Sequence, residues 1–136
     1  PIVDMMKSST ILTLAVEIPR SVAVSFDIQH LKRIVTNFLS NGIKFTENGS
    51  ITLSAKIVGD IVEITVEDSG PGIPKEEQSL LFRPFERLTK SGESAGFGLG
   101  LSLVKVLAEL NGGYVFYRTS TTGGSIFGLG APLAEL

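Results

Sequence analysis

The sequence predicts an α+β fold, a two-layer sandwich in which about three helices cover one face of a mixed, mostly antiparallel sheet. Two alternating runs, 51–58 and 61–68, are separated only by Gly59-Asp60, which is typical of a β-hairpin. A second pair of strand-like runs closes the chain at 114–119 and 125–131. Since hairpins rather than helical crossovers join these strands, we expect the helices to gather on one side of the sheet.

The composition limits the possible classes of protein. The 136 residues fit one domain with a single core, since 43% of them are hydrophobic. No apolar run approaches the roughly 20 residues of a membrane span, and a net charge of −2 favours neither nucleic acid nor an anionic bilayer. The absence of cysteine excludes disulfides and thiolate metal sites. The chain opens on Pro1 without a methionine, so we expect a piece of a longer protein.

Residues 27–48 predict a long amphipathic helix that begins at an N-cap, Asp27, and ends at Asn48-Gly49. Asparagine is unusual inside a helix because it favours caps and turns. Two amide oxygens one turn apart suit a hard cation, and a following ammonium suits phosphate; a solvated polar face is the ordinary alternative. The apolar side comprises Leu31, Ile34, Val35, Phe38, Leu39 and Phe45. The polar side comprises His30, Arg33, Asn37, Asn41 and Lys44.

Shorter elements complete the expected fold. Residues 10–18 alternate as a half-buried strand, and 22–26 read as a second short strand. Pro74 suits the first turn of a short helix that continues through Leu81. Residues 82–98 lose periodicity, which predicts a mobile loop with a function. The helix expected next has an apolar stripe of Leu99, Leu103, Val106, Leu107 and Leu110.

The first glycine cluster, Asp68-Ser69-Gly70-Pro71-Gly72, stands at the end of an expected strand. Glycines let the backbone approach a flat ligand closely, and a carboxylate at the base of such a pocket accepts a hydrogen bond from an exocyclic amine. An ordinary Asp-Ser-Gly turn is the alternative.

The second cluster, Gly96-Phe97-Gly98-Leu99-Gly100, leads directly into a helix. Glycine-rich backbone before a helix N-terminus presents N–H groups and a positive dipole end, which suits phosphate. The spacing alone is a weak signal, because the strand of a dinucleotide-binding unit and the Gly-Lys-Ser/Thr of a Walker loop are both missing. The downstream motifs of protein kinases are missing too.

Aromatic and basic residues precede this second cluster. We expect Phe82 and Phe85 to anchor the long loop in the core. Arg83, Arg87 and Lys90 lie close enough in sequence to reach an anion that the glycine loop holds.

Four motifs in this order resemble the N, G1, F and G2 boxes of the catalytic, ATP-binding domain of sensor histidine kinases. That family belongs to the superfamily of gyrase, heat-shock chaperones, histidine kinases and MutL. The resemblance runs from about Val22 to Pro132 and includes Gly-Gly-Ser-Ile-Phe at 123–127. The motifs are Asn-x-x-x-Asn-x-x-Lys (37–44), Asp-x-Gly-x-Gly (68–72), Phe-x-Pro-Phe (82–85) and Gly-x-Gly-x-Gly-Leu (96–101).

The resemblance implies a Bergerat-type sandwich that binds ATP between the long helix and a flexible lid, about residues 82–98. It implies that Asn41 ligates Mg²⁺ with help from Asn37, and that Lys44 meets the phosphates; these three form the catalytic group. It further implies that Phe45 lies against the adenosine and that Asp68 accepts from the adenine amino group. The implied nucleotide-binding residues are Asn41, Lys44, Phe45, Asp68, Gly70, Gly72, Ile73, Arg87, Gly96, Gly98, Leu99, Gly100 and Leu101.

The activity that the resemblance implies is transfer of the γ-phosphoryl group of ATP to a histidine, for relay to a response regulator. His30 lies inside the nucleotide helix and does not match the acceptor motif, so residues 1–136 are expected to be the catalytic domain without its phosphoacceptor domain. Members that hydrolyse ATP have a glutamate base where this chain has Asn37, which favours a phosphotransferase. Two departures from the family pattern are Gly42 in place of alanine and Arg33 in place of glutamine or glutamate.

Two alternatives stay open. The first is a degenerate module that binds nucleotide without transferring phosphate, and the second is a serine kinase of the anti-sigma-factor type. Acid lability of the product separates phosphohistidine from phosphoserine. For a kinase of this family we expect a cytoplasmic location, with any membrane anchor upstream, and no contact of this part with nucleic acid or membrane.

Overall fold

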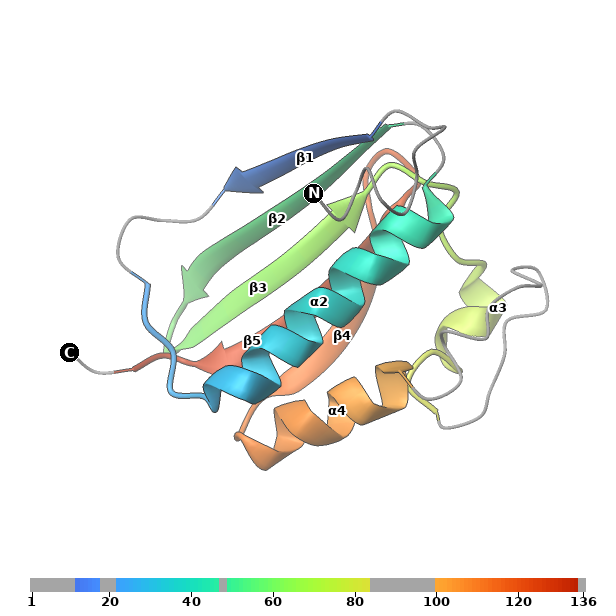
Figure 1. Cartoon of the computed structure of the whole chain (residues 1–136). Coiled ribbons are helices and arrows are strands. Elements are labelled where there is room, and N and C mark those ends of the chain that lie inside the picture. Colours follow the sequence, from blue (N-terminus) through green and yellow to red (C-terminus); the bar gives the residue numbers. More distant parts are fainter. Residues whose placement is uncertain (1–11, 18–21, 47–48, 84–99, 135–136) are drawn as a thin grey trace.

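The structure, a computed structural model, describes residues 12–17, 22–46, 49–83 and 100–134. It confirms the predicted α+β class: one sheet with its helices on one face (Figure 1). In chain order the elements are β1 (Leu12–Glu17), α2 (Ile28–Phe45), β2 (Gly49–Val58), β3 (Ile61–Asp68), α3 (Lys75–Gln78), α4 (Gly100–Leu110), β4 (Tyr114–Thr119) and β5 (Ser125–Pro132).

The sheet has five strands in the order β1-β2-β3-β5-β4. The pairs β2–β3, β3–β5 and β4–β5 are antiparallel, whereas β1 is parallel to β2, so the sheet is mixed as predicted. The predicted hairpin is confirmed, with Gly59 in the turn at φ 64°. Its register pairs Ile51 with Asp68, and β5 continues the sheet beside β3. This order brings the C-terminal end of β3 next to the N-terminal end of β5.

Helix α2 packs its apolar side on the sheet. The side chain of Asp27 accepts hydrogen bonds from the N–H groups of Gln29 and His30, which confirms the predicted N-cap. Phe38 is fully buried and stacks on Phe127 of β5 with 5.8 Å between ring centroids. The helix ends earlier than predicted, at Phe45, because Thr46 already has an extended conformation. The core beneath α2 and α4 comprises Ile34, Phe38, Ile43, Ile51, Val66, Leu81, Leu101, Val104, Leu107, Ala108, Phe127, Leu129 and Ala131.

Two predicted elements are shorter than expected. Residues 22–26 do not form a strand; Val24 makes an isolated bridge with Leu133, because the chain turns at once into the cap at Asp27. The short helix after Pro74 covers only Lys75–Gln78.

The predicted apolar stripe of α4 is wrong at three positions, although Leu107 is buried as predicted and Leu99 lies outside the described residues. Leu103, Val106 and Leu110 are 38%, 52% and 71% exposed. The buried side instead comprises Leu101, Val104, Leu107 and Ala108. The helix has apolar residues on both sides, so helical periodicity alone could not show which side faces the sheet.

Asn111 joins the start of α2 to the end of α4. Its Oδ1 accepts from the backbone N–H of Asp27 at 2.9 Å, and its Nδ2 donates to the carbonyl of Leu107 at 2.7 Å. The same Nδ2 lies 3.0 Å from Nδ1 of His30. These bonds fix the two helices side by side on the sheet. None of the described helices has both the length and the hydropathy to span a bilayer.

Candidate functional site

Asp68 lies at the end of β3 and is 5% exposed. Its Oδ1 accepts from the N–H of Gly70 at 2.9 Å and from the N–H of Ser125 at 3.2 Å. Burial raises the pKa of Asp68 above its usual value, and the two N–H bonds oppose that shift without overcoming it. Since both bonds use Oδ1, the other carboxylate oxygen keeps its capacity to accept from a further donor.

Two glycines let the segment after Asp68 pack against the turn between β4 and β5. A Cβ atom on Gly124 would lie 1.9 Å from the carbonyl oxygen of Asp68. A Cβ atom on Gly72, which has φ 76°, would lie 2.4 Å from the carbonyl oxygen of Gly123. Only glycine fits at both positions without a backbone shift. The Asp-x-Gly-x-Gly segment is therefore shaped by a hairpin more than 50 residues away in the chain, as the positions of Gly72 and Gly124 show.

Hydrogen bonds add to this packing. The N–H of Ile73 donates to Oη of Tyr117 at 3.1 Å, and that Oη lies 2.8 Å from Oγ of Ser125. Nε2 of Gln78 donates to the carbonyl of Ile73 at 2.9 Å and to Oγ1 of Thr119 at 3.4 Å. Sequence reasoning missed Tyr117, Ser125 and Gln78. Tyr117 and Ser125 lie on neighbouring strands, but only the register of β4 and β5 brings their side chains together.

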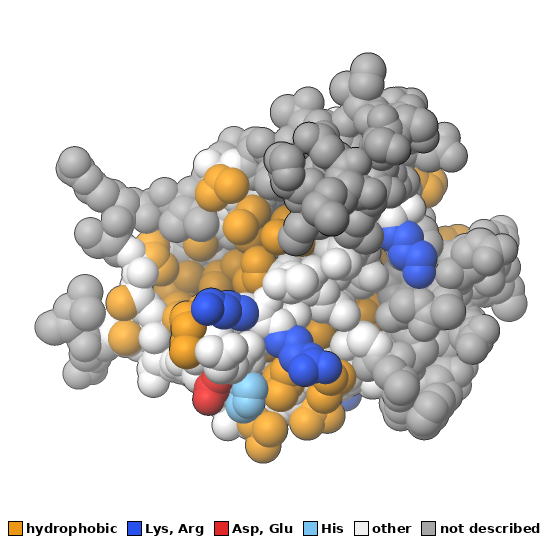
Figure 2. Space-filling view, in the orientation of Figure 1, with side chains coloured by type: hydrophobic (Ala, Val, Ile, Leu, Met, Phe, Trp, Pro, Cys, Tyr) orange, Lys and Arg blue, Asp and Glu red, His pale blue; other side chains and the backbone are white. Residues whose placement is uncertain are grey.

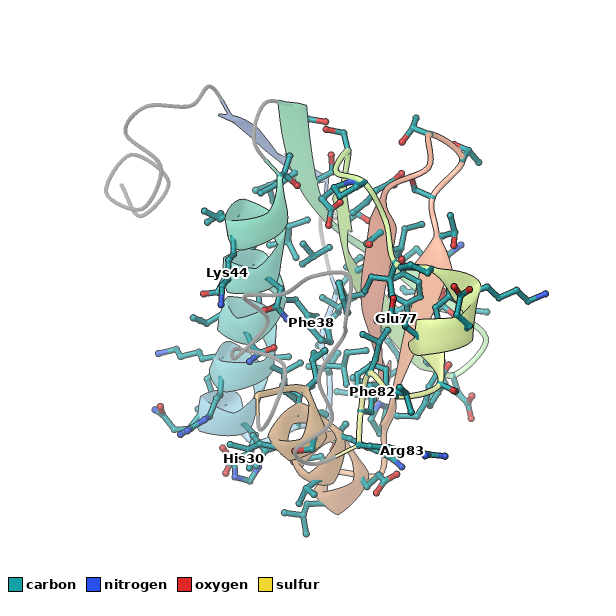
Figure 3. The ribbon with its side chains drawn as sticks, turned by 90° about the vertical axis from the view of Figure 1, so that its right-hand side faces the viewer. His30, Phe38, Lys44, Glu77, Phe82 and Arg83 are labelled. Carbon is teal, nitrogen blue, oxygen red and sulfur yellow. The ribbon has the colours of Figure 1, made fainter. Side chains whose placement is uncertain are left out.

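The paired asparagines of α2 are hydrogen-bonded to each other. Nδ2 of Asn41 donates to Oδ1 of Asn37 at 3.3 Å, and Asn41 is 5% exposed. Because Asn41 uses its nitrogen here, its carbonyl oxygen is the amide atom that can ligate a cation or accept another bond. Lys44 is exposed in the last turn of α2. Figure 3 shows it on the side of α2 that faces away from Phe38 and the sheet.

Helix α4 begins at Gly100, directly beside the asparagine pair. A Cβ atom on Gly100 would lie 2.7 Å from Nδ2 of Asn37, so the first turn of α4 approaches the polar side of α2 very closely. The positive end of a helix dipole lies at its first turn. Leu101, the next residue, is fully buried in the core and anchors the first turn of α4 there.

A groove of about 700 Å³ runs between the outer sides of α2 and α4. Figure 2 shows blue lysine and arginine side chains, and a pale blue histidine side chain, next to orange hydrophobic side chains on this face. Its lining residues are Gln29, His30, Lys32, Arg33, Thr36, Asn37, Ser40, Leu103 and Leu107.

The structure brings some predicted residues together and leaves others out. Asn37, Asn41 and Gly100 form one cluster. Asp68, Gly70, Gly72 and Ile73 form another at the end of β3. Phe82 is half-buried against the core, in agreement with its predicted role as an anchor, and Arg83 is exposed. Outside the described residues lie Arg87, Gly96, Gly98, Leu99, most of the predicted lid at 82–98, and the side chain of Phe45.

The sequence profile of the family described as "Histidine kinase-, DNA gyrase B-, and HSP90-like ATPase" matches residues 26–135. This chain is 36% identical over 126 residues to the sensor histidine kinase TmoS of Ectopseudomonas mendocina, covering 90% of this chain and 13% of TmoS. It is 40% identical over 109 residues to the circadian input-output histidine kinase CikA of Synechococcus elongatus, covering 78% of this chain and 14% of CikA. With the adaptive-response sensory kinase SasA of Synechococcus the identity is 32%, over 90% of this chain and 33% of SasA. The chain therefore spans a third or less of these curated relatives.

Solved structures agree with the fold. The mycobacterial sensor histidine kinase MprB superposes with a TM-score of 0.81 and 26% identity over 99% of this chain and 91% of that one. Full-length ShkA in complex with AMPPNP gives a TM-score of 0.78 and 28% identity over 99% of this chain and 29% of ShkA. The catalytic domain of histidine kinase ThkA gives a TM-score of 0.77 and 27% identity over 96% of this chain and 88% of that domain.

Proposed function

Since this chain belongs to the family of histidine kinase-, DNA gyrase B- and HSP90-like ATPases, we propose that it is the ATP–Mg²⁺-binding catalytic domain of a two-component sensor histidine kinase. It transfers the γ-phosphoryl group of ATP to a histidine on a separate dimerisation domain, from which a response regulator takes it. This chemistry uses cytoplasmic ATP, so we assign the domain to the cytoplasm. The observation that carries the proposal is Asp68, a buried carboxylate held through one oxygen at the mouth of a glycine-shaped loop.

Recognition of the base depends on Asp68. Its Oδ1 is committed to two backbone N–H groups, so its other oxygen accepts from the adenine amino group. Gly70, Gly72 and Ile73 form the wall of the base pocket, since the bonds and close contacts described above hold them in one place. Phe45 lies against the adenosine in this proposal.

The asparagine pair serves the phosphates. The buried donor set fits a hard cation, because Asn41 offers a carbonyl oxygen while its nitrogen is held by Asn37. Bound Mg²⁺ supplies neutralisation of the charged triphosphate. Lys44 adds a positive charge one turn further along α2. On the lid side the proposed nucleotide-binding residues are Arg87, Gly96, Gly98, Leu99, Gly100 and Leu101, of which Leu101 would contribute its backbone because its side chain is buried in the core.

The side chain of Asn37 supports transfer rather than hydrolysis. An amide cannot accept a proton at neutral pH, so Asn37 does not activate a water molecule as a carboxylate would. Its oxygen already accepts from Asn41, which gives it a positioning role. We therefore expect the chain alone to bind ATP and to turn it over very slowly.

The exposed apolar residues on the outer side of α4 support the proposal that a partner domain docks there. Leu103, Val106 and Leu110 follow one another at helical spacing and are exposed, and Leu103 lines a groove that is also lined by Lys32 and Arg33. An exposed apolar stripe rimmed by charge is typical of a docking surface. The occupant that we propose is a helix of the phosphoacceptor domain with acidic residues beside its apolar side, which fits curated relatives of which this chain spans a third or less.

Calorimetric titration tests binding. ATP should bind the wild-type chain more tightly with Mg²⁺ than with EDTA, and Asp68→Asn should weaken binding about 10- to 100-fold, because a hydrogen bond to a charged group is lost. Equal binding by the wild type and Asp68→Asn would contradict the assignment of the base pocket.

Incubation with ATP and a supplied histidine-kinase dimerisation domain tests transfer. The expected product is acid-labile phosphate on that domain's histidine. Tight ATP binding with no phosphate on any partner histidine would instead indicate the degenerate, binding-only module. Acid-stable phosphate would indicate the serine kinase.

A further inference from the structure

Asp68 and the loop that follows it are both hydrogen-bonded to the β4–β5 hairpin, and the side chain of Tyr117 takes part at both places. Ser125 holds Asp68 through its backbone N–H, and Tyr117 holds the loop by accepting from the N–H of Ile73. The two hydroxyl groups are 2.8 Å apart. Ile73 is therefore linked to Asp68 by two hydrogen bonds of the Tyr117 and Ser125 side chains and then, through the covalent frame of Ser125, by the hydrogen bond from its backbone N–H.

The geometry points to Tyr117 as a positioning residue for adenine: its hydroxyl fixes Ser125 and Ile73, and through them the orientation of Asp68 toward the exocyclic amino group of the base. The inference rests on the proposed function, since it concerns how the proposed pocket selects its base. It adds to that proposal a residue outside the four sequence motifs, on strand β4.

Packing of the aromatic ring does not explain why this position has tyrosine rather than phenylalanine. The ring packs edge-on against Phe127 with 5.2 Å between centroids, a contact that phenylalanine would make equally well. The hydroxyl satisfies the N–H of Ile73, a half-buried group that otherwise loses its acceptor. Whichever hydroxyl donates in the Tyr117–Ser125 pair, the bond restricts the side chain of Ser125, the residue whose backbone N–H reaches Asp68.

Gln78 completes the arrangement from the other side of the loop. Its Nε2 donates to the carbonyl of Ile73 and to Oγ1 of Thr119, which is on the same strand as Tyr117. The N–H of Ile73 therefore bonds to β4 directly, and its carbonyl is linked to β4 indirectly, through Gln78 of α3. Asp68 is then held at two points, by the N–H of Gly70 in the same loop and by the N–H of Ser125, the residue that Tyr117 contacts.

The test compares two nucleotides on one variant. Tyr117→Phe keeps the ring and removes only the hydroxyl. Titration with ATP and with purine riboside triphosphate, which lacks the 6-amino group, separates an effect on the amino group from a general loss of binding. We expect Tyr117→Phe to weaken ATP about tenfold and to leave the affinity for purine riboside triphosphate within about twofold.

The chain offers a matched control in Tyr114→Phe. Tyr114 is on the same strand with its ring over Gly130 and is 43% exposed, away from Ser125 and Ile73. This control should bind both nucleotides like the wild type. A second variant, Ser125→Ala, removes the partner hydroxyl but keeps the N–H that bonds Asp68, so Tyr117→Phe should cost less than tenfold in that background.

Equal weakening of both nucleotides by Tyr117→Phe, or no weakening of either, would overturn the inference while the proposed ATP binding stood. A full tenfold loss in the Ser125→Ala background would overturn the route through Ser125. A wild-type chain that bound the two nucleotides equally would overturn adenine recognition by Asp68, and this inference with it.

Discussion

Nδ2 of Asn37 lies 2.7 Å from the position that a Cβ atom would occupy on Gly100. The two residues are 63 positions apart in the chain and belong to different helices. Their contact makes the start of α4 part of the same polar cluster as the asparagine pair. A single methyl group at Gly100 would disturb it.

Gly100→Ala should separate stability from nucleotide binding. Alanine favours a helix more than glycine does, so the free energy of unfolding should stay unchanged or rise by up to about 1 kcal/mol. The added methyl must displace the Asn37 amide, and with it the bond from Asn41, so affinity for ATP–Mg²⁺ should fall about tenfold. Urea unfolding and calorimetry measure the two effects. Unchanged ATP–Mg²⁺ affinity would argue against a role for this contact.

Asn41→Ala should remove the magnesium dependence of binding. If the carbonyl oxygen of Asn41 holds the cation, ATP should bind the variant with nearly the same affinity in Mg²⁺ and in EDTA. Ser40→Ala, at the neighbouring half-buried position, should keep the wild-type difference. A magnesium effect of wild-type size in Asn41→Ala would show that other atoms hold the cation.

Gly42→Ala should stabilise the protein. Gly42 is buried within α2, and a Cβ atom there would lie 3.4 Å from Cδ1 of Ile51, an ordinary van der Waals contact. The free energy of unfolding should rise by about 1 kcal/mol, since alanine is the better helix former. Gly59→Ala is the matched comparison: its φ of 64° strains any other residue, so it should lose about 1 kcal/mol. Destabilisation by Gly42→Ala would mean that Ile51 cannot accommodate the methyl group.

Asp68 should make the protein less stable as pH rises. Burial raises its folded-state pKa above the unfolded value of 3.8, so its contribution to stability is fully present below pH 3.8 and is lost as pH rises through the folded-state pKa. Asp68→Asn does not ionise, so the free energy of unfolding of the wild type relative to this variant should fall across that window. The lowered pKa of Asp27, caused first by the bond from the His30 N–H, has the opposite effect but is common to both proteins.

Urea unfolding of the wild type and Asp68→Asn at several pH values measures this difference. A relative stability that rose with pH would mean that the carboxylate is favoured in the folded state and that the cost of burial is not dominant. Asp68→Asn should also bind ATP poorly. Above the folded-state pKa of Asp68, the variant protein would therefore be more stable relative to the wild type but less able to bind nucleotide.

Asn111→Ala should loosen the two helices. The variant loses the acceptor for the Asp27 N–H and the donor to the Leu107 carbonyl, so the free energy of unfolding should fall by about 1–3 kcal/mol. The control is Gln29→Ala, at an exposed position in the groove between α2 and α4. It should change the free energy of unfolding by less than about 0.5 kcal/mol. Equal stability of the two variants would show that water replaces both bonds.

The sequence by itself determined the local elements. The Gly59-Asp60 hairpin, the Asp27 cap and the closing strands follow from turn chemistry and alternation over a few residues, and the structure has them. The order of the four motifs likewise indicated the family that the profile matches. These features depend on neighbours in the chain, so they can be read without knowing the fold.

Only the tertiary structure decided what depends on distant segments. Periodicity fitted two sides of α4, and contact with the sheet selected the side of Val104 rather than that of Leu103. The need for glycine at 124 and 100, and the bonds of Tyr117, arise where segments far apart in sequence meet. Burial against a particular neighbour is a property of the packed chain, so no local pattern could have predicted it.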